Sequence, residues 1–131
     1  MSLFLLDTDT VSFALRGAGN VATTLLLQTP SQVAISAVTL GELRFGAEKR
    51  KSKKLHTLID VFCGTIEVLP YDGEAAIHFG KLCVLLQRRG TPIGISDTMI
   101  AAHAQSAGRV LVTNNVRHFS RVPGLKLENW L

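Results

Sequence analysis

Short runs that are apolar at almost every position constrain this chain most. They are LFLL (3–6), VAIS (33–36), IEVL (66–69) and VLVT (110–113). A run that is apolar at successive positions is typical of a strand covered on both faces. Segments with helical spacing or turn signals separate these runs. The alternation predicts an α/β fold with three layers and a mostly parallel central sheet flanked by helices. Helices are expected over 10–15, 21–28, 38–48, 54–62, 74–88 and 96–107, and a weak last strand over 125–129.

Length and composition narrow the possibilities further. We expect one domain over residues 1–131, because this length suits a single core. A hydrophobic content of 47% argues against long disorder. No apolar run approaches the ~20 residues of a membrane span, and no basic secretory leader is visible. Cys63 and Cys83 lack a CxxC spacing, so they are expected to be reduced, buried thiols of a cytoplasmic protein rather than zinc ligands.

The positive charge is concentrated in one segment. The chain has a net charge of +4, and the segment 44–54 alone holds six basic residues and one acid. Such a local patch suits a polyanion, with nucleic acid the first candidate. A solvated helix end explains the patch equally well. The exposed basic residues are expected to be Lys49, Arg50, Lys51, Lys53 and Lys54.

Metal-binding residue types follow the ends of the expected strands. Asp7 comes directly after the first strand, and Glu42 lies in the helix after the second. Asp97 opens the helix before the fourth strand, which Thr113 ends and Asn115 follows. In parallel sheets, ligands bind beyond the carboxyl ends of the strands. Carboxylates gathered there repel one another unless a cation is bound, and all-oxygen ligands favour Mg²⁺ or Mn²⁺.

Each of these residues also has a purely structural interpretation. Asp7 could cap the following helix, although Asp9 fits that cap better. Glu42 could complete a capping box with Thr39, and Ser96 could be the N-cap of the helix that holds Asp97. Thr113 and Asn115 could be turn formers. Spacing alone leaves both interpretations open.

Four blocks of the sequence resemble the VapC toxins, which are PIN-domain endoribonucleases of bacterial toxin–antitoxin pairs. The blocks are FLLDTDTVS, AISAVTLGELRFGAEK, GTPIGISDTMIAAHA and LVTNNVRHFSRVPGLKLENW. They occur in the family's order and span nearly the whole chain. The resemblance therefore implies the PIN fold for this chain.

The resemblance also implies a metal-dependent mechanism. It places Asp7, Glu42 and Asp97 around Mg²⁺ or Mn²⁺, with Thr113 and Asn115 in support. Many relatives have an acid at the position of Asn115, and some at that of His118. The ion would activate water for attack on an RNA phosphodiester. The basic residues at 49–54 would contact the RNA backbone.

The family implies partners as well. These are a VapB antitoxin that inhibits the enzyme, a second copy in a homodimer, and operator DNA bound only through the antitoxin complex. Relatives with a similar first block cut the anticodon loop of initiator tRNA, so a tRNA substrate is expected. The apolar segment VATTLLL (21–27) suits a partner contact as well as a core. His118 is expected to be a surface residue, and His103 to pack or face a partner.

Two other functions fit parts of the sequence. FLLDTDTV also resembles the first motif of haloacid-dehalogenase-type phosphatases, in which Asp7 would be the nucleophile and Asp9 the acid. The later motifs of that family are missing. A catalytically silent nucleic-acid-binding module is the other possibility. It would use the basic patch, with the acids acting only as caps.

Overall fold

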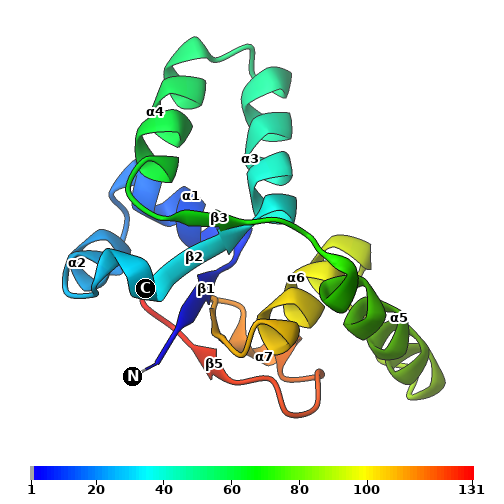
Figure 1. Cartoon of the computed structure of the whole chain (residues 1–131). Coiled ribbons are helices and arrows are strands. Elements are labelled where there is room, and N and C mark those ends of the chain that lie inside the picture. Colours follow the sequence, from blue (N-terminus) through cyan, green and yellow to red (C-terminus); the bar gives the residue numbers. More distant parts are fainter. Residues whose placement is uncertain (1) are drawn as a thin grey trace.

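The computed structural model describes residues 2–131, in which a central parallel sheet lies between two layers of helices (Figure 1). The strand order is β3-β2-β1-β4-β5, and every neighbouring pair is parallel. The predicted fold class is confirmed. The strands are β1 (Phe4–Leu6), β2 (Val33–Ser36), β3 (Glu67–Leu69), β4 (Val110–Val112) and β5 (Leu127–Glu128).

The helices follow the predicted order, with two short additions. Gly17 ends α1 in the left-handed conformation, at φ 66°. The 3-10 helix η1 (Pro30–Gln32) and helix α7 (Val116–Phe119) are too short to give a periodic signal. The other helices are α1 (Thr8–Arg16), α2 (Val21–Leu26), α3 (Ala37–Lys49), α4 (Lys53–Cys63), α5 (Gly73–Arg88) and α6 (Ile95–Ser106).

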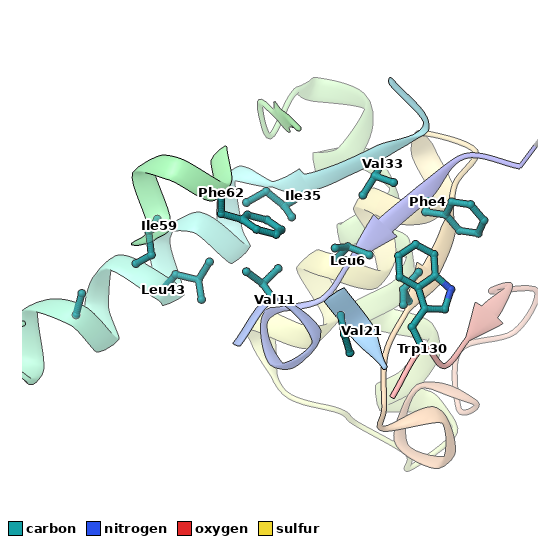
Figure 2. Close-up of a cluster of buried hydrophobic side chains, with 12 residues drawn as sticks. Phe4, Leu6, Val11, Val21, Val33, Ile35, Leu43, Ile59, Phe62 and Trp130 are labelled. Atoms are coloured by element: carbon teal, nitrogen blue, oxygen red, sulfur yellow. The ribbon is translucent and has the colours of Figure 1, made fainter. Parts of the chain in front are cut away.

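Successive residues of the central strand face opposite layers. Phe4 and Leu6 pack with side chains of α1–α4, whereas Leu5 packs with side chains of α5–α7. Figure 2 shows the first of these clusters, in which the Trp130 ring lies beside Phe4. The two ring centroids are 5.0 Å apart and the rings meet edge to face. Because both faces of β1, β2 and β4 are covered, these strands are apolar without alternation, as predicted. The edge strand β3 differs, since its Glu67 is exposed.

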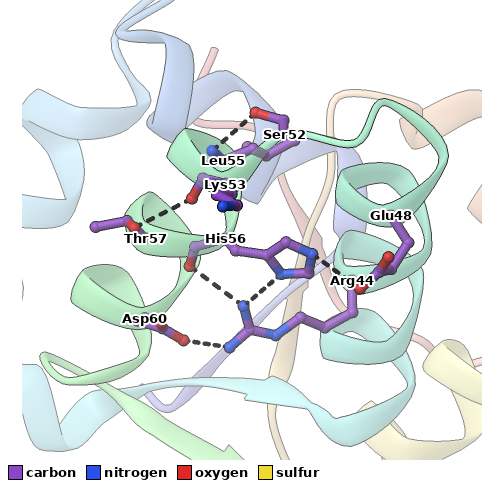
Figure 3. A network of polar contacts seen from close by, with 8 residues as sticks. All are labelled: Arg44, Glu48, Ser52, Lys53, Leu55, His56, Thr57 and Asp60. Carbon is purple, nitrogen blue, oxygen red and sulfur yellow. Dashed lines mark hydrogen bonds and ion pairs between the residues drawn. The ribbon is translucent and has the colours of Figure 1, made fainter.

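Helices α3 and α4 form a hairpin that extends from the sheet (Figure 1). Polar side chains join the two helices near its middle (Figure 3). Arg44 donates to the backbone oxygen of His56 at 3.2 Å and to its Nδ1 at 3.0 Å, and also pairs with Asp60. His56 Nε2 faces Glu48 Oε1 at 3.4 Å. These contacts fix the hairpin, and they engage Arg44 within the fold.

Cys63 is the last residue of α4, and Cys83 lies within α5. Cys63 and Cys83 are free thiols, as predicted, but both are half-buried rather than buried. None of the helices described for residues 2–131 has the length and apolarity that crossing a lipid bilayer demands.

We expect Trp130→Ala to lower the free energy of unfolding by about 3–5 kcal/mol, because it leaves a cavity in the core. Trp130 is 4% exposed, and its indole Nε1 donates to Glu128 Oε1 at 2.8 Å. Urea denaturation would measure the loss. The matched control is Leu27→Ala, whose side chain is 79% exposed and whose loss should cost under about 0.5 kcal/mol. Equal losses for the two variants would show that the carboxyl-terminal segment does not belong to the core.

Candidate active site

The carboxyl ends of the three middle strands lie at one level. Leu6 of β1 is in register with Ile35 of β2 and with Val112 of β4. The chain order reverses between β1 and β4, which is where parallel sheets open a crevice for ligands. Asp7 and Thr113 directly follow these two strands. The register therefore brings residues from distant parts of the sequence to one crevice.

Asp7 caps helix α1 and is almost completely buried. Its Oδ1 accepts from the backbone N of Thr10 at 2.8 Å, so Asp7 and not Asp9 is the N-cap. The side chain of Thr10 donates instead to Val112 O, at 3.0 Å. Asp7 is 4% exposed. Burial raises the pKa of Asp7, which hydrogen bonds from Thr113 and Thr10 partly oppose. The protein therefore holds a carboxylate where its charge is poorly solvated.

Glu42 faces the crevice from helix α3. The N-cap of this helix is Ser36, whose Oγ accepts from Val38 N at 3.1 Å, so the Thr39–Glu42 capping box is wrong. Glu42 Oε1 instead accepts a 2.6 Å hydrogen bond from the hydroxyl of Thr8 in α1. This bond fixes the carboxylate of one helix against the start of another.

A buried histidine supports the beginning of helix α3. His103 Nδ1 lies 2.8 Å from Ser36 Oγ, and both side chains are buried. Burial lowers the pKa of His103, so the ring is neutral at pH 7 and Nδ1 can accept the proton of the Ser36 hydroxyl. The expected packing role of His103 is confirmed.

Asp97 is held by a histidine from the short helix α7. Helix α6 begins after Gly94, at φ 92°, so Ser96 is not its N-cap and Asp97 lies in its first turn. His118 Nε2 is 2.9 Å from Asp97 Oδ2 and 3.1 Å from Ile93 O. Since both partners are acceptors, Nε2 carries the proton. The expectation that His118 is a surface residue is wrong.

Thr113 and Asn115 shape the other side of the crevice. Thr113 is completely buried, and its hydroxyl oxygen accepts from the backbone N of Asn115 at 2.9 Å. Asn115 precedes helix α7 and is exposed. The structure therefore brings both residues to the edge where Asp7 lies.

An acidic pocket of about 220 Å³ joins these residues. Three predicted carboxylates and Asn115 line it together, and Asp9 adds a fourth carboxylate. Within residues 2–131, no three Asp, Glu, His or Cys side chains stand close enough to enclose a metal ion. The oxygen donors still suit Mg²⁺ or Mn²⁺, because Mg²⁺ uses one or two carboxylates and keeps several waters. The pocket is lined by Asp7, Thr8, Asp9, Glu42, Asp97, Asn115 and Phe119.

The basic patch lies at the tip of the α3–α4 hairpin. All five of its predicted residues, Lys49, Arg50, Lys51, Lys53 and Lys54, are exposed there. Glu42 is seven positions before Lys49 on the same helix, a rise of about 10 Å. Arg50 lines a groove that also contains Glu42. Of the five, Arg50 is therefore the one that the structure connects with the acidic pocket.

Thr8 and His118 were missed as candidate site residues. Their roles depend on hydrogen bonds between elements that are 34 and 21 positions apart in the sequence. The only signal in the sequence is that a polar residue with a side-chain donor lies beside an expected strand end.

Comparison with known proteins gives consistent matches over the whole chain. The PIN-domain family matches residues 4–125. The tRNA(fMet)-specific endonuclease VapC of Salmonella typhimurium is 42% identical over 131 residues, which cover 99% of each chain. Ribonuclease VapC2 of Haemophilus influenzae is 35% identical, with both chains fully covered.

Solved structures give the same result. The DNA-bound VapBC complex from Salmonella typhimurium contains a chain that matches with a TM-score of 0.93 and 42% identity, with both chains fully covered. VapBC2 from Rickettsia felis, bound to a DNA fragment from its promoter, matches with a TM-score of 0.89 and 32% identity over 98% of this chain and 99% of that one. The chain therefore belongs to the PIN-domain family and, within it, to the VapC ribonucleases.

Proposed function

We propose that this protein is a Mg²⁺- or Mn²⁺-dependent endoribonuclease and the toxin of a VapB–VapC pair. The observation that carries the proposal is the acidic pocket at the switch point of the sheet, which Asp7, Glu42 and Asp97 line together. Metal-dependent nucleases use such a site to hold an ion that neutralises charge on a phosphodiester. Products would carry a 5′-phosphate and a 3′-hydroxyl.

Asp7, Glu42 and Asp97 would hold the ion, each through oxygen. When bound, the ion supplies an activated water and neutralises charge that develops on the phosphate. Thr8 and His118 keep two of these carboxylates oriented through hydrogen bonds of 2.6 and 2.9 Å. Such supporting partners are commonly worth 10–100-fold in metal affinity or activity. Asn115 would orient water or substrate without adding charge, and buried Thr113 would steady Asp7.

The substrate and partners are inferred from the relatives. We propose a tRNA substrate, with the anticodon loop of initiator tRNA as the first target to test, since the 42% identical relative is named for tRNA(fMet). Lys49, Arg50, Lys51, Lys53 and Lys54 would contact RNA phosphates. A cognate VapB would inhibit the enzyme, as the VapBC complexes suggest.

Further assembly is proposed on the same basis. The apolar side chains of Leu26 and Leu27 are exposed and support a partner contact. We propose that the chain acts as one domain over residues 1–131, as a homodimer in the bacterial cytoplasm, and reaches operator DNA only through the antitoxin.

The phosphatase and the silent binding module are not favoured. The PIN match covers residues 4–125, and the later phosphatase motifs are missing from the sequence. Asp9 also lies in the acidic pocket, so its substitution separates the two enzymes. Asp9→Asn should abolish hydrolysis of a phosphate monoester by a phosphatase, but should affect a nuclease only mildly.

We expect protein freed of antitoxin to cut total bacterial tRNA at discrete sites with Mg²⁺ and not with EDTA. Asp7→Asn should lower the rate by roughly 10²–10³-fold, because it removes a charged ligand while keeping the capping oxygen. End-mapping of the fragments would identify the target. The control is Glu74→Gln, an exposed acid on α5 outside the pocket. Cutting that persists in EDTA, or in Asp7→Asn, would contradict the proposal.

We expect Asp7→Asn to stabilise the metal-free protein at pH 7. Burial raises the pKa of Asp7 above its unfolded value, so folding favours the protonated acid. That contribution is complete below the unfolded pKa and is lost as pH rises through the folded pKa. Once Asp7 is ionised, the wild type therefore carries a buried charge that Thr10 and Thr113 compensate only in part, and asparagine removes this charge.

Thermal melting in EDTA and in Mn²⁺ would measure this effect. The wild-type melting temperature should rise with Mn²⁺ and fall between acidic and neutral pH, and Asp7→Asn should show much less of either change. A variant less stable than wild type in EDTA at pH 7 would contradict the assignment.

We expect His118→Leu to raise the Mn²⁺ concentration needed for half-maximal cleavage by about 10–100-fold, because Asp97 loses its donor. His118→Gln keeps an N–H donor and should retain most of the affinity. Electron paramagnetic resonance of free Mn²⁺ would measure binding without any turnover. If the wild type, His118→Leu and His118→Gln bound Mn²⁺ with equal affinity, His118 would have only a packing role.

A further inference from the structure

We propose that the groove between α1, α3 and α4 binds a nucleotide of single-stranded RNA that adjoins the scissile phosphate. The proposal rests on the proposed nuclease function and adds a substrate subsite to it. The groove has a volume of about 270 Å³ and shares Thr8, Asp9 and Glu42 with the acidic pocket. The two spaces therefore adjoin each other, and a strand that left the pocket on this side would reach the groove.

The part of the groove that lies away from Asp9 and Glu42 is basic. Arg16 lies on its wall in the last turn of α1, with its guanidinium 4.9 Å from the Phe13 ring and its Nε 3.3 Å from Ser12 O. Arg50 lies on the wall directly after α3. Within residues 2–131 no carboxylate lies at ion-pair distance from either arginine. Both guanidinium groups are available to an anion, and their planar donors match a phosphate.

Leucines form the apolar part of the groove. Leu15, Leu43 and Leu55 contribute one wall residue each from α1, α3 and α4. An apolar wall in a groove that two arginines also line matches the chemistry of a nucleotide, with a base or ribose against the leucines and a phosphate at the guanidinium groups. Unstacked bases of single-stranded loops offer such faces, whereas paired bases do not.

Gly46 keeps the groove open. It lies inside α3, where glycine costs about 1 kcal/mol relative to alanine. Its φ is not in the left-handed region, and an added Cβ would meet no atom within 4 Å. Neither backbone conformation nor packing explains glycine here, but its missing side chain leaves space in the groove that it lines.

Charge favours RNA over a peptide as the occupant. The exposed residues Lys49, Lys51, Lys53 and Lys54 adjoin Arg50 at the tip of the hairpin and extend the positive surface beyond the groove. A peptide with basic side chains would be attracted to the acidic pocket but repelled by this surface.

The test is Gly46→Leu, measured by fluorescence anisotropy with a short labelled single-stranded RNA in EDTA, where cleavage cannot occur. The leucine should fill the groove and weaken binding on the order of tenfold, a change of about 1.4 kcal/mol. The melting temperature should stay equal or rise, because a helical glycine is replaced. Gly80→Leu is the matched control, since Gly80 is an exposed glycine of α5 that also has open space around its Cα.

Arg16→Gln and Arg50→Gln test the charged part without filling the groove. Each should reduce the slope of log affinity against log salt concentration by about 0.7, the value for one lost phosphate contact on a single strand. Arg88→Gln, an exposed arginine of α5 outside the groove, should leave the slope unchanged.

Unchanged RNA affinity in Gly46→Leu, or unchanged salt slopes in both arginine variants, would overturn the proposal. Unchanged RNA affinity together with weaker binding of a VapB tail peptide would assign the groove to the antitoxin instead. Because binding is measured without metal, RNA bound in the groove by a protein that does not cut would refute the nuclease and leave the subsite standing.

Discussion

The burial of the Asp7 carboxylate at the end of the central strand is the constraint on which the site depends. An unpaired buried charge is costly, and the raised pKa of Asp7 reflects that cost. The surroundings offset part of it, because the N–H of Thr10 and the side chain of Thr113 hydrogen-bond to the carboxylate. What remains is best offset by a cation. The parallel register makes this arrangement possible, since it places the ends of β1 and β4 side by side.

The second feature is that the carboxylates are positioned by elements far apart in the chain. Thr8 joins α1 to α3 through Glu42, and His118 joins α7 to α6 through Asp97. The buried hydrogen bond between Ser36 and His103 supports the start of α3. The acids are thus held near one another without forming a closed ligand set. Asp7, Glu42 and Asp97 would hold a cation through few protein ligands, which would leave room for water and phosphate beside it.

In the proposed function, the acidic pocket and the basic surface would have different roles in binding RNA. Four carboxylates repel a phosphate unless a cation lies between them, whereas Arg16 and Arg50 attract one with or without metal. Affinity would therefore reside mainly in the groove and the hairpin tip, and chemistry in the pocket. The Arg44–His56–Asp60 contacts keep that hairpin rigid, which holds the patch in one place relative to Glu42.

Much of the fold could be predicted from the apolar runs. A strand that is buried on both faces, such as Val33–Ser36, has such a run in its sequence. Asp7, Glu42 and Asp97 could be expected to meet, because strand ends converge in parallel sheets. The capping box at Glu42 and the surface position of His118 were wrong for one reason. Local spacing cannot tell a bond within a helix from one to an element 34 or 21 residues away. Helix α7, with four residues, has no period to detect.

The most direct measurement is a crystal structure of the protein grown with Mn²⁺, with the anomalous signal of manganese used to locate the ion. We expect a peak in the acidic pocket within coordination distance of Asp7 and of Glu42 or Asp97, with water completing the shell. A peak bound only by Asp7 and Asp9 would support the phosphatase arrangement. A pocket without manganese at saturating concentration would contradict the central claim.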